Sequence, residues 1–194
     1  MNKTNRNRTT EKMQVRDICL TGMFTALIVV CSQLSIPMPA GVPMTLQTFI
    51  IPLAGIVLGA KRGTIATCIY LLLGAVGLPV FAGFSGGPGI LFGITGGFLL
   101  SFPLLALFAG LGSRYDNKVK TAAGLIIGAV LNYIVGMIMF AALTDTGMGY
   151  AFTACVLPFI PTAIIKIVLA EIIGLQMKKL LRRAGVLGMP VQTV

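Results

Sequence analysis

Residues 74–97 read GAVGLPVFAGFSGGPGILFGITGG, and this stretch decides how we interpret the rest of the chain. It is apolar enough for a membrane interior, but glycine recurs throughout it, and Pro79 and Pro88 interrupt it. One continuous helix is therefore disfavoured. Glycine lacks a Cβ and accepts positive φ, so its backbone folds tightly and approaches another molecule closely. Irregular backbone at membrane depth persists only where protein buries it or a polar cavity accommodates it. We predict a loop between two transmembrane helices that forms one wall of a ligand site.

The composition indicates a membrane protein. Hydrophobic residues make up 56% of the 194 residues and charged residues only 10%, against about 25% charged in a soluble domain. The net charge of +10 comes from Lys and Arg that cluster in short blocks between long uncharged runs. Such blocks mark the cytoplasmic ends of membrane spans, so we predict a lipid bilayer as the environment and no nucleic-acid partner.

The charge pattern predicts an all-α membrane protein with six transmembrane helices and both termini in the cytoplasm. Basic blocks alternate with loops that lack Lys and Arg, as the positive-inside rule requires for six spans. The predicted spans are 18–36, 48–60, 64–78, 95–112, 121–143 and 150–177. The spans form one domain, 18–183, between a basic tail, 1–17, and a C-terminal tail, 184–194. The alternative for the first span is a signal peptide cleaved after Ala40; we favour a multi-pass protein of the cell membrane.

Lys166 is the one basic residue inside a predicted span. It lies about 18 Å from Lys178 at the end of its helix, which places it near mid-membrane. A charge at this depth costs at least ~2.5–3.5 kcal/mol on insertion scales. We interpret Lys166 as a contact for an anionic or strongly polar ligand. The alternatives are snorkelling, or pairing with Glu171, with backbone carbonyls or with water.

A few uncharged polar groups lie near the outer half of the predicted bundle and favour a small, mostly apolar pocket. These groups are Thr45, Gln47, Ser85, Thr95 and Asn132. We also predict that four aromatic side chains pack against a ring of the ligand: Phe81, Phe84, Phe92 and Phe98. The alternative for each polar group is a structural bond to the helix backbone, and for each aromatic residue a lipid-facing position.

Several absences argue against an enzyme. The chain contains no histidine, no Ser/His/Asp set and no GxxxxGK[ST] motif for binding ATP phosphates. We predict neither a metal nor a cofactor, and we interpret the four cysteines as packing residues. If transport is active, another subunit must supply the energy.

The first span also carries small residues four positions apart on one face: Thr21, Gly22, Thr25 and Ala26. Such spacing lets two helices approach closely. The face is either packed inside the bundle or used to dock another membrane subunit.

Four separated motifs, in this order, resemble those of the BioY family, the biotin-binding S components of energy-coupling factor transporters. They are VPMTLQTF at 42–49, LLLGAVGLPVFAG at 71–83, GGPGILFGITGG at 86–97 and PFIPTAIIK at 158–166. The resemblance covers nearly all of the chain after residue 17. It implies an S-component-like fold that binds biotin near the outer surface, with biotin as the transported ligand.

The resemblance also implies functional residues. In the family, the first loop contributes to the pocket, which corresponds to Thr45, Gln47 and Thr48, and the glycine-rich loop covers the ligand, which corresponds to Phe81, Gly83 and Gly86. The family's last helix carries an acid and a lysine three residues apart. The lysine corresponds to Lys166, but Ala163 stands where the acid is expected.

The implied partners are a transmembrane coupling subunit and two cytoplasmic ATPases, with Gly22 and Ala26 at the docking face. The missing acid leaves open a second function, as an S component for another small vitamin. A stand-alone biotin permease is the remaining alternative.

Overall fold

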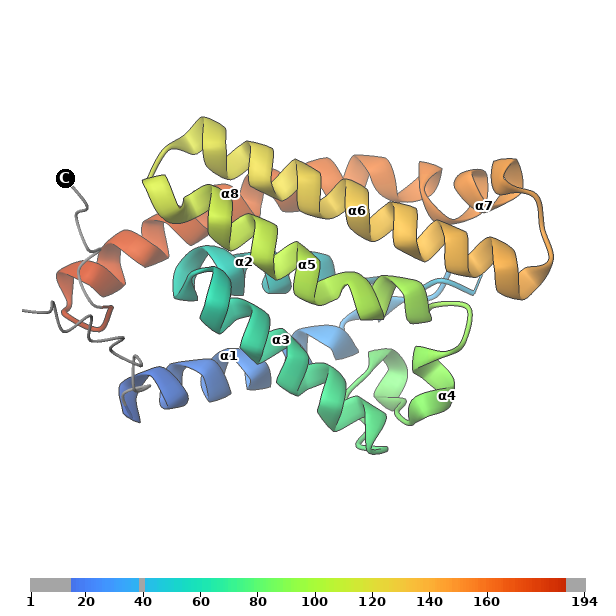
Figure 1. Ribbon diagram of the computed structural model, residues 1–194, viewed down its shortest axis with the longest axis horizontal. Helices are drawn as coiled ribbons and strands as arrows, with labels where there is room; N and C mark the ends of the chain where they lie inside the picture. The colour runs from blue at the N-terminus through green and yellow to red at the C-terminus, as the bar shows by residue number, and fades with distance from the viewer. Residues whose placement is uncertain (1–14, 39–40, 188–194) are drawn as a thin grey trace, which may run out of the picture.

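The computed structural model describes residues 15–38 and 41–187, and it is mostly helical (Figure 1). Most of the two predicted tails, residues 1–14 and 188–194, lies outside the described residues. The elements in chain order are α1 (Val15–Gln33), β1 (Ser35–Ile36), β2 (Met44–Thr45), α2 (Gln47–Leu58), α3 (Ala60–Ala75), η1 (Ala82–Phe84), α4 (Pro88–Leu91), α5 (Gly96–Gly112), η2 (Ser113–Tyr115), α6 (Lys118–Thr144), α7 (Met148–Cys155), η3 (Leu157–Phe159) and α8 (Ile160–Arg183).

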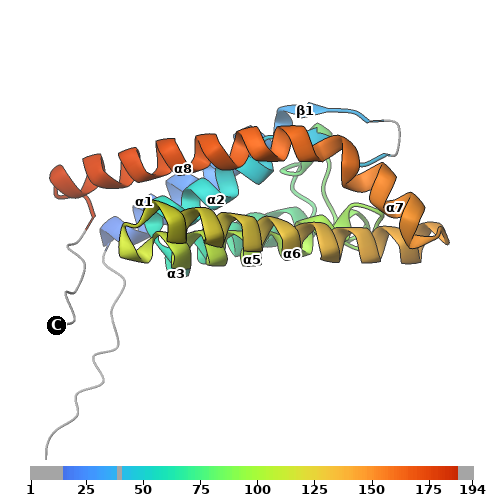
Figure 2. The same cartoon turned by 90° about the horizontal axis from the view of Figure 1, so that it is seen from above.

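The helices form an elongated bundle with two different ends (Figures 1 and 2). One end, which we call the basic end, holds the start of α1, the α2–α3 and α5–α6 turns and the end of α8. The other, the loop end, holds the β1–β2 hairpin, α4 and α7. Of the Lys and Arg that the structure describes, only Lys166 lies away from the basic end.

Within the described part of the chain, four helical segments are long and apolar enough to cross a membrane by length and composition. They are Val15–Gln33, Gly96–Tyr115, Lys118–Thr144 and Met148–Arg183. The helices α2 and α3 are shorter, so the count of six spans stays a prediction. Each of the six predicted apolar segments nevertheless contains helix.

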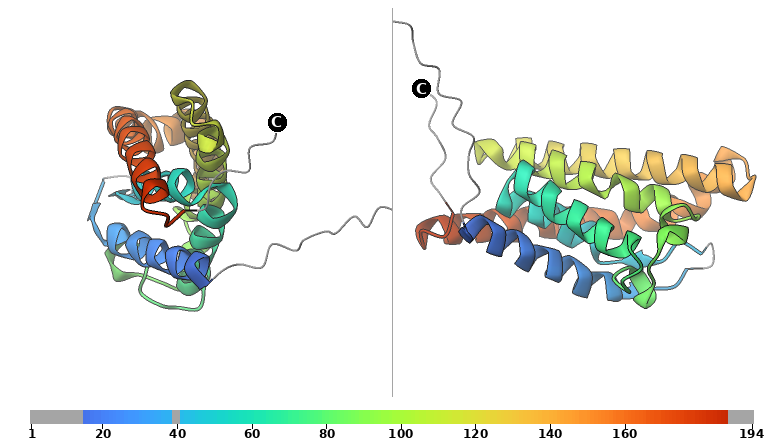
Figure 3. Two further views of the ribbon diagram at one scale, coloured as in Figure 1. Left: turned by 90° about the vertical axis from the view of Figure 1, so that its left-hand side faces the viewer. Right: turned by 60° about the horizontal axis from the view of Figure 1, so that its bottom comes forward.

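Helix α2 lies in the middle of the bundle, where it contacts α1, α3, α5 and α8 (Figure 3). Nearly all of its residues are buried, as expected for a helix that is apolar on every side. Because α2 begins directly after β2, the first residues of this central helix reach the loop end.

The break between α2 and α3 differs from the sequence prediction. We expected Lys61 and Arg62 to close the second span, but they lie in the first turn of α3. The break falls at Gly59, whose φ of 84° favours glycine over any other residue. Arg62 pairs instead with Asp17 of α1 at 2.8 Å, although Asp17 was expected in the tail.

Proline interrupts the last apolar segment, as predicted. Helix α7 ends at Cys155, the turn η3 contains Pro158, and α8 begins at Ile160 with Pro161 in its first turn. In that position the missing N–H costs no hydrogen bond. The glycine-rich stretch 74–97 is also irregular as predicted, but it contains the short helical elements η1 and α4.

Near the basic end, three helices meet through glycine at a junction that we call the glycine seam. A Cβ on Gly55 of α2 would overlap the carbonyl of Ala106 of α5, and one on Gly110 of α5 would overlap the backbone of Ala60. A Cβ on Gly63 of α3 would come within 2.6 Å of the Cα of Gly55. The backbones of α2, α3 and α5 therefore touch here without side chains between them.

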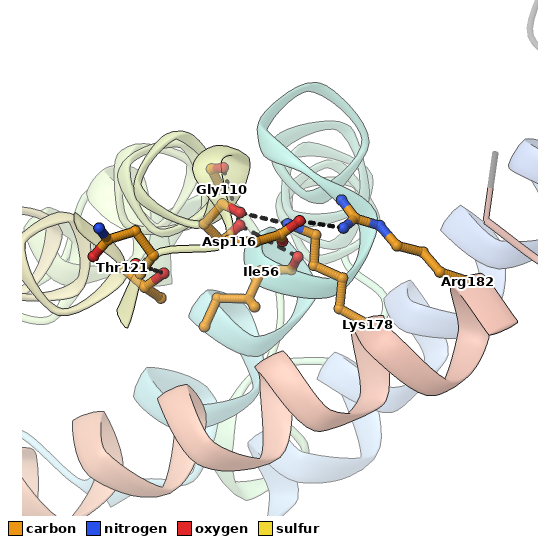
Figure 4. A network of polar contacts seen from close by, with 8 residues as sticks. Ile56, Gly110, Asp116, Thr121, Lys178 and Arg182 are labelled. Atoms are coloured by element: carbon orange, nitrogen blue, oxygen red, sulfur yellow. Dashed lines mark hydrogen bonds and ion pairs between the residues drawn. The ribbon is translucent and has the colours of Figure 1, made fainter. Parts of the chain in front are cut away.

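An ion-pair cluster ties α8 to the α5–α6 turn (Figure 4). The ammonium of Lys178, which is buried, lies 3.0 Å from the carboxylate of Asp116 and also donates to the carbonyl of Ser113. Arg182 donates to the other carboxylate oxygen. Partial burial works to raise the pKa of Asp116, but these two cations outweigh it and hold that pKa below its ordinary value.

The chain beyond α8 packs against the basic end rather than leaving it at once. Gly185 accepts a hydrogen bond from Arg16 of α1, and Leu187 is 7% exposed and belongs to the main apolar core. The first residues of the predicted C-terminal tail therefore help to close the bundle.

Candidate functional site

A cavity of about 240 Å³ lies at the loop end, between the β1–β2 hairpin, the glycine-rich loop and helices α2, α5, α6, α7 and α8. Eight of the ten predicted polar and loop residues line it, although they come from segments far apart in the sequence. These eight are Thr45, Gln47, Thr48, Phe81, Ser85, Thr95, Asn132 and Lys166. The structure thus brings the predicted residues to one place, while their contact with a ligand stays a prediction.

The other two predicted residues, Gly83 and Gly86, lie in the same loop but do not line the cavity. Gly83 adopts a φ of 69°, and a Cβ on Gly86 would overlap the carbonyl of Leu78. Glycine is therefore needed at both positions for the loop to adopt this backbone conformation.

Lys166 points from α8 toward the start of α2. Its Nζ donates to the carbonyl of Thr45 at 2.7 Å and to the hydroxyl of Thr48 at 3.1 Å. Within the described residues it forms no ion pair with Glu171 or any other acid. Because an ammonium has three donors, one donor of Lys166 remains for a ligand.

A buried polar chain holds the residues next to Lys166. Thr45 donates through its hydroxyl to Oε1 of Gln47 at 2.7 Å, and Nε2 of Gln47 donates to the hydroxyl of Tyr70. Tyr70 is fully buried on α3, and its ring meets Phe81 edge-on at 5.5 Å between centroids. The side-chain amide of Gln47 therefore links Thr45 to Tyr70, with its oxygen bonded at one end and its nitrogen at the other.

Asn132 of α6 contributes an oriented amide. Its Nδ2 donates to the carbonyl of Phe98 at 2.9 Å and to the hydroxyl of Ser101 at 2.7 Å. Its Oδ1 accepts no hydrogen bond from any residue in the described part of the chain. Asn132 is only 2% exposed and lines the cavity, so its amide is held in place and its Oδ1 remains as an acceptor.

Aromatic side chains form much of the wall. Of the four expected phenylalanines, Phe81 and Phe98 line the cavity, while Phe84 and Phe92 are 73% and 70% exposed. Sequence reasoning missed Phe102 and Phe159 because phenylalanine is common in apolar spans. It also left out Tyr133, although a phenol beside Asn132 in an apolar helix was a usable signal.

The small-residue face of α1 splits into two parts. Thr21 and Thr25 are buried, and the hydroxyl of Thr25 donates to the carbonyl of Ala66 on α3. Gly22 and Ala26 are exposed, and a Cβ on Gly22 would meet nothing within 4 Å. The threonines therefore pack inside the bundle, and the other two residues leave a shallow surface outside.

Comparison with known proteins gives one consistent result. The model of the BioY family matches residues 4–183. A probable biotin transporter BioY of Pyrococcus horikoshii is 41% identical over 162 residues, which cover 84% of this chain and 96% of the relative. The biotin transporter BioY of Thermotoga maritima is 40% identical over 167 residues, covering 86% of this chain and 98% of the relative.

A solved structure agrees with the relatives. The crystal structure of the S-component for biotin from an ECF-type ABC transporter superposes with a TM-score of 0.78 at 26% identity, covering 92% of this chain and 95% of that one. From the family match, the two transporters and this shared fold, we conclude that the chain belongs to the BioY family.

Proposed function

We propose that this protein captures biotin in the cavity at the loop end and serves as the substrate-binding subunit of an energy-coupling factor transporter. The observation that carries the proposal is the cavity itself, where Lys166 and Asn132 stand among aromatic walls. Biotin has a ureido group that both donates and accepts, an apolar middle made of a thioether ring and a hydrocarbon chain, and a carboxylate. Lys166 has a donor for either the ureido oxygen or the carboxylate, and Asn132 has an acceptor for a ureido N–H.

The direct test is equilibrium binding of biotin to the purified protein in detergent or nanodiscs. We expect saturable binding at one site per chain, together with a rise in melting temperature, because a ligand that binds only the folded state stabilises it. Absence of binding under conditions where the protein stays folded would refute the proposal.

Ala163 motivates the second candidate function, binding of another small vitamin. It lines a small hollow next to the cavity, together with Thr48, Asn132 and Tyr133. The acid that the family resemblance implies is absent there. Competition of labelled biotin by a panel of vitamins separates the two functions, since the true ligand displaces the label at the lowest concentration.

We further propose that the chain crosses the membrane six times, with the basic end in the cytoplasm. Support comes from the position of the described Lys and Arg at that end. Alkaline phosphatase inserted after Gly147 should be active, and the same enzyme fused after Arg183 should be inactive. The reverse result would contradict this orientation.

The proposed partners are a membrane coupling subunit, docking at Gly22 and Ala26, and two cytoplasmic ATPases. The solved relative is the S-component for biotin of an ECF-type ABC transporter, which supports an assembly of this kind. Biotin uptake by proteoliposomes with and without the coupling module distinguishes this assembly from a stand-alone permease.

A further inference from the structure

The wall of the cavity formed by residues 80–85 adopts an unfavourable backbone conformation. Gly83 and Phe84 follow one another with φ of 69° and 54°. A left-handed conformation is uncommon for a bulky residue and persists where surrounding contacts hold it. The Phe84 side chain is 73% exposed, so its own burial does not supply those contacts.

This segment, which we call the Phe81 loop, contributes directly to the cavity. Phe81 is 1% exposed and lines the cavity together with Ala82 and Ser85. The loop is closed on itself by a hydrogen bond from the N–H of Phe81 to the carbonyl of Ser85 at 2.9 Å. A displacement of the loop therefore moves the Phe81 ring and opens the wall.

Gln33, the last residue of α1, binds the Phe81 loop at two points. Its Oε1 accepts the N–H of Phe84 at 2.9 Å, and its Nε2 donates to the carbonyl of Val80 at 3.2 Å. The Nε2 group also donates to the hydroxyl of Ser32 at 2.9 Å, and Ser32 itself donates to the same Val80 carbonyl. The end of α1 thus holds both sides of the loop. One of the two bonds is donated by the N–H of Phe84, the bulky residue with positive φ.

Gln33 does not line the cavity, so its effect on a ligand is indirect. We propose that Gln33 is a positioning residue, which keeps the Phe81 loop closed over the ligand by bonding Val80 and Phe84 from outside the cavity. The effect on the ligand rests on the proposed biotin function; the effect on the loop does not. The same contacts connect the ligand wall to α1, the helix that presents Gly22 and Ala26 on its outer surface.

The test replaces Gln33 with methionine, which has nearly the same length and forms neither hydrogen bond. We expect the dissociation rate of biotin to rise about tenfold or more, because each bond contributes a modest net stabilisation of the closed loop. The association rate should stay within about twofold, since the groups that meet the ligand are unchanged. Both rates come from stopped-flow measurements on the full-length protein.

Hydrogen exchange of the ligand-free protein provides a readout that is independent of biotin. The amides of residues 80–85 should exchange about tenfold faster in Gln33→Met, while those in the middle of α3 keep their wild-type rate. Gln176→Met is the matched control, because Gln176 is exposed on α8 near the basic end. It should leave both the exchange and the dissociation rate at wild-type values.

Each result of the exchange and binding experiments leads to a different conclusion. Unchanged exchange at residues 80–85 in Gln33→Met would overturn the positioning role whether or not biotin binds. If the wild-type protein binds no biotin, the proposed function is refuted. Faster exchange of residues 80–85 in Gln33→Met would still support the role of Gln33 in holding the loop. Faster exchange throughout the bundle, with a fall in melting temperature, would show a general structural role and would contradict the proposal.

Discussion

Replacing Lys166 with methionine separates ligand binding from folding. The substitution keeps the length of the side chain and removes the ammonium that now donates to Thr45 and Thr48. A hydrogen bond that involves a charged group contributes about 1.5–3 kcal/mol. At 1.4 kcal/mol for each factor of ten, we expect the Kd for biotin to rise roughly 10- to 150-fold.

Stability should respond differently from affinity. Removing the buried charge relieves an insertion cost of about 2.5–3.5 kcal/mol, while the two lost hydrogen bonds, at about 1.5–3 kcal/mol each, cost about 3–6 kcal/mol. We therefore expect the free energy of unfolding of the ligand-free protein to fall by no more than about 3 kcal/mol.

Isothermal titration with biotin gives the Kd, and thermal unfolding without ligand gives the stability. Thr153→Ala is a suitable control because its exposed hydroxyl bonds only the local helix carbonyl of Tyr150. An unchanged Kd for Lys166→Met would remove Lys166 from the site. A large loss of stability in the ligand-free variant would instead show that the ammonium is needed for the fold.

Three further substitutions test the fold and the docking surface. Gly97→Ala should destabilise the protein by about 1–3 kcal/mol, because the new Cβ would lie 2.6 Å from the carbonyl of Val135; Gly149→Ala, with open space around it, should be neutral in thermal unfolding. Asp116→Asn should lower the melting temperature, since the buried Lys178 would lose its charge partner. The pKa of Asp116 is lowered, so its stabilisation is present above the ordinary carboxyl value of 3.8 and is lost as the pH falls below it; a pH series of melting temperatures for wild type and variant should converge in acid. Ala26→Leu should leave biotin binding intact and reduce copurification of the coupling subunit, and normal copurification would place the docking surface elsewhere.

The sequence predicts helix ends well where a strong local signal marks them. The span expected at 95–112 corresponds to α5, Gly96–Gly112, and the break at Pro158 falls between α7 and α8. Glycine clusters and proline act through the backbone of their own residue, so their effect is largely independent of tertiary contacts.

The prediction fails where two local signals compete. The charges of Lys61 and Arg62 predict the end of a span, but Gly59 ends the helix before them and the two charged residues lie in the first turn of the next helix. The β1–β2 hairpin was not predicted, because strands of two residues have no periodicity to detect. Its pairing continues one residue beyond the strands, where the N–H of Leu46 donates to the carbonyl of Leu34, the residue after α1.

The sequence predicts the charged residue of the candidate site, but it does not predict which apolar residues line the cavity. Lys166 is conspicuous because a charge inside a span needs a reason. Its bonds to Thr45 and Thr48 join residues more than a hundred positions apart, so no local sequence pattern predicts these bonds. Phe102 comes from α5 and Phe159 from η3, and only the tertiary fold brings both to the cavity.

The glycine seam has a mechanical consequence. Helices that meet through side chains shift past one another by small sliding movements. At the seam the backbones of α2, α3 and α5 are themselves in contact, so a Cβ added at Gly55, Gly63 or Gly110 would push two helices apart. We expect the movement that admits a ligand to come from the hairpin and the glycine-rich loop that border the cavity, rather than from this junction.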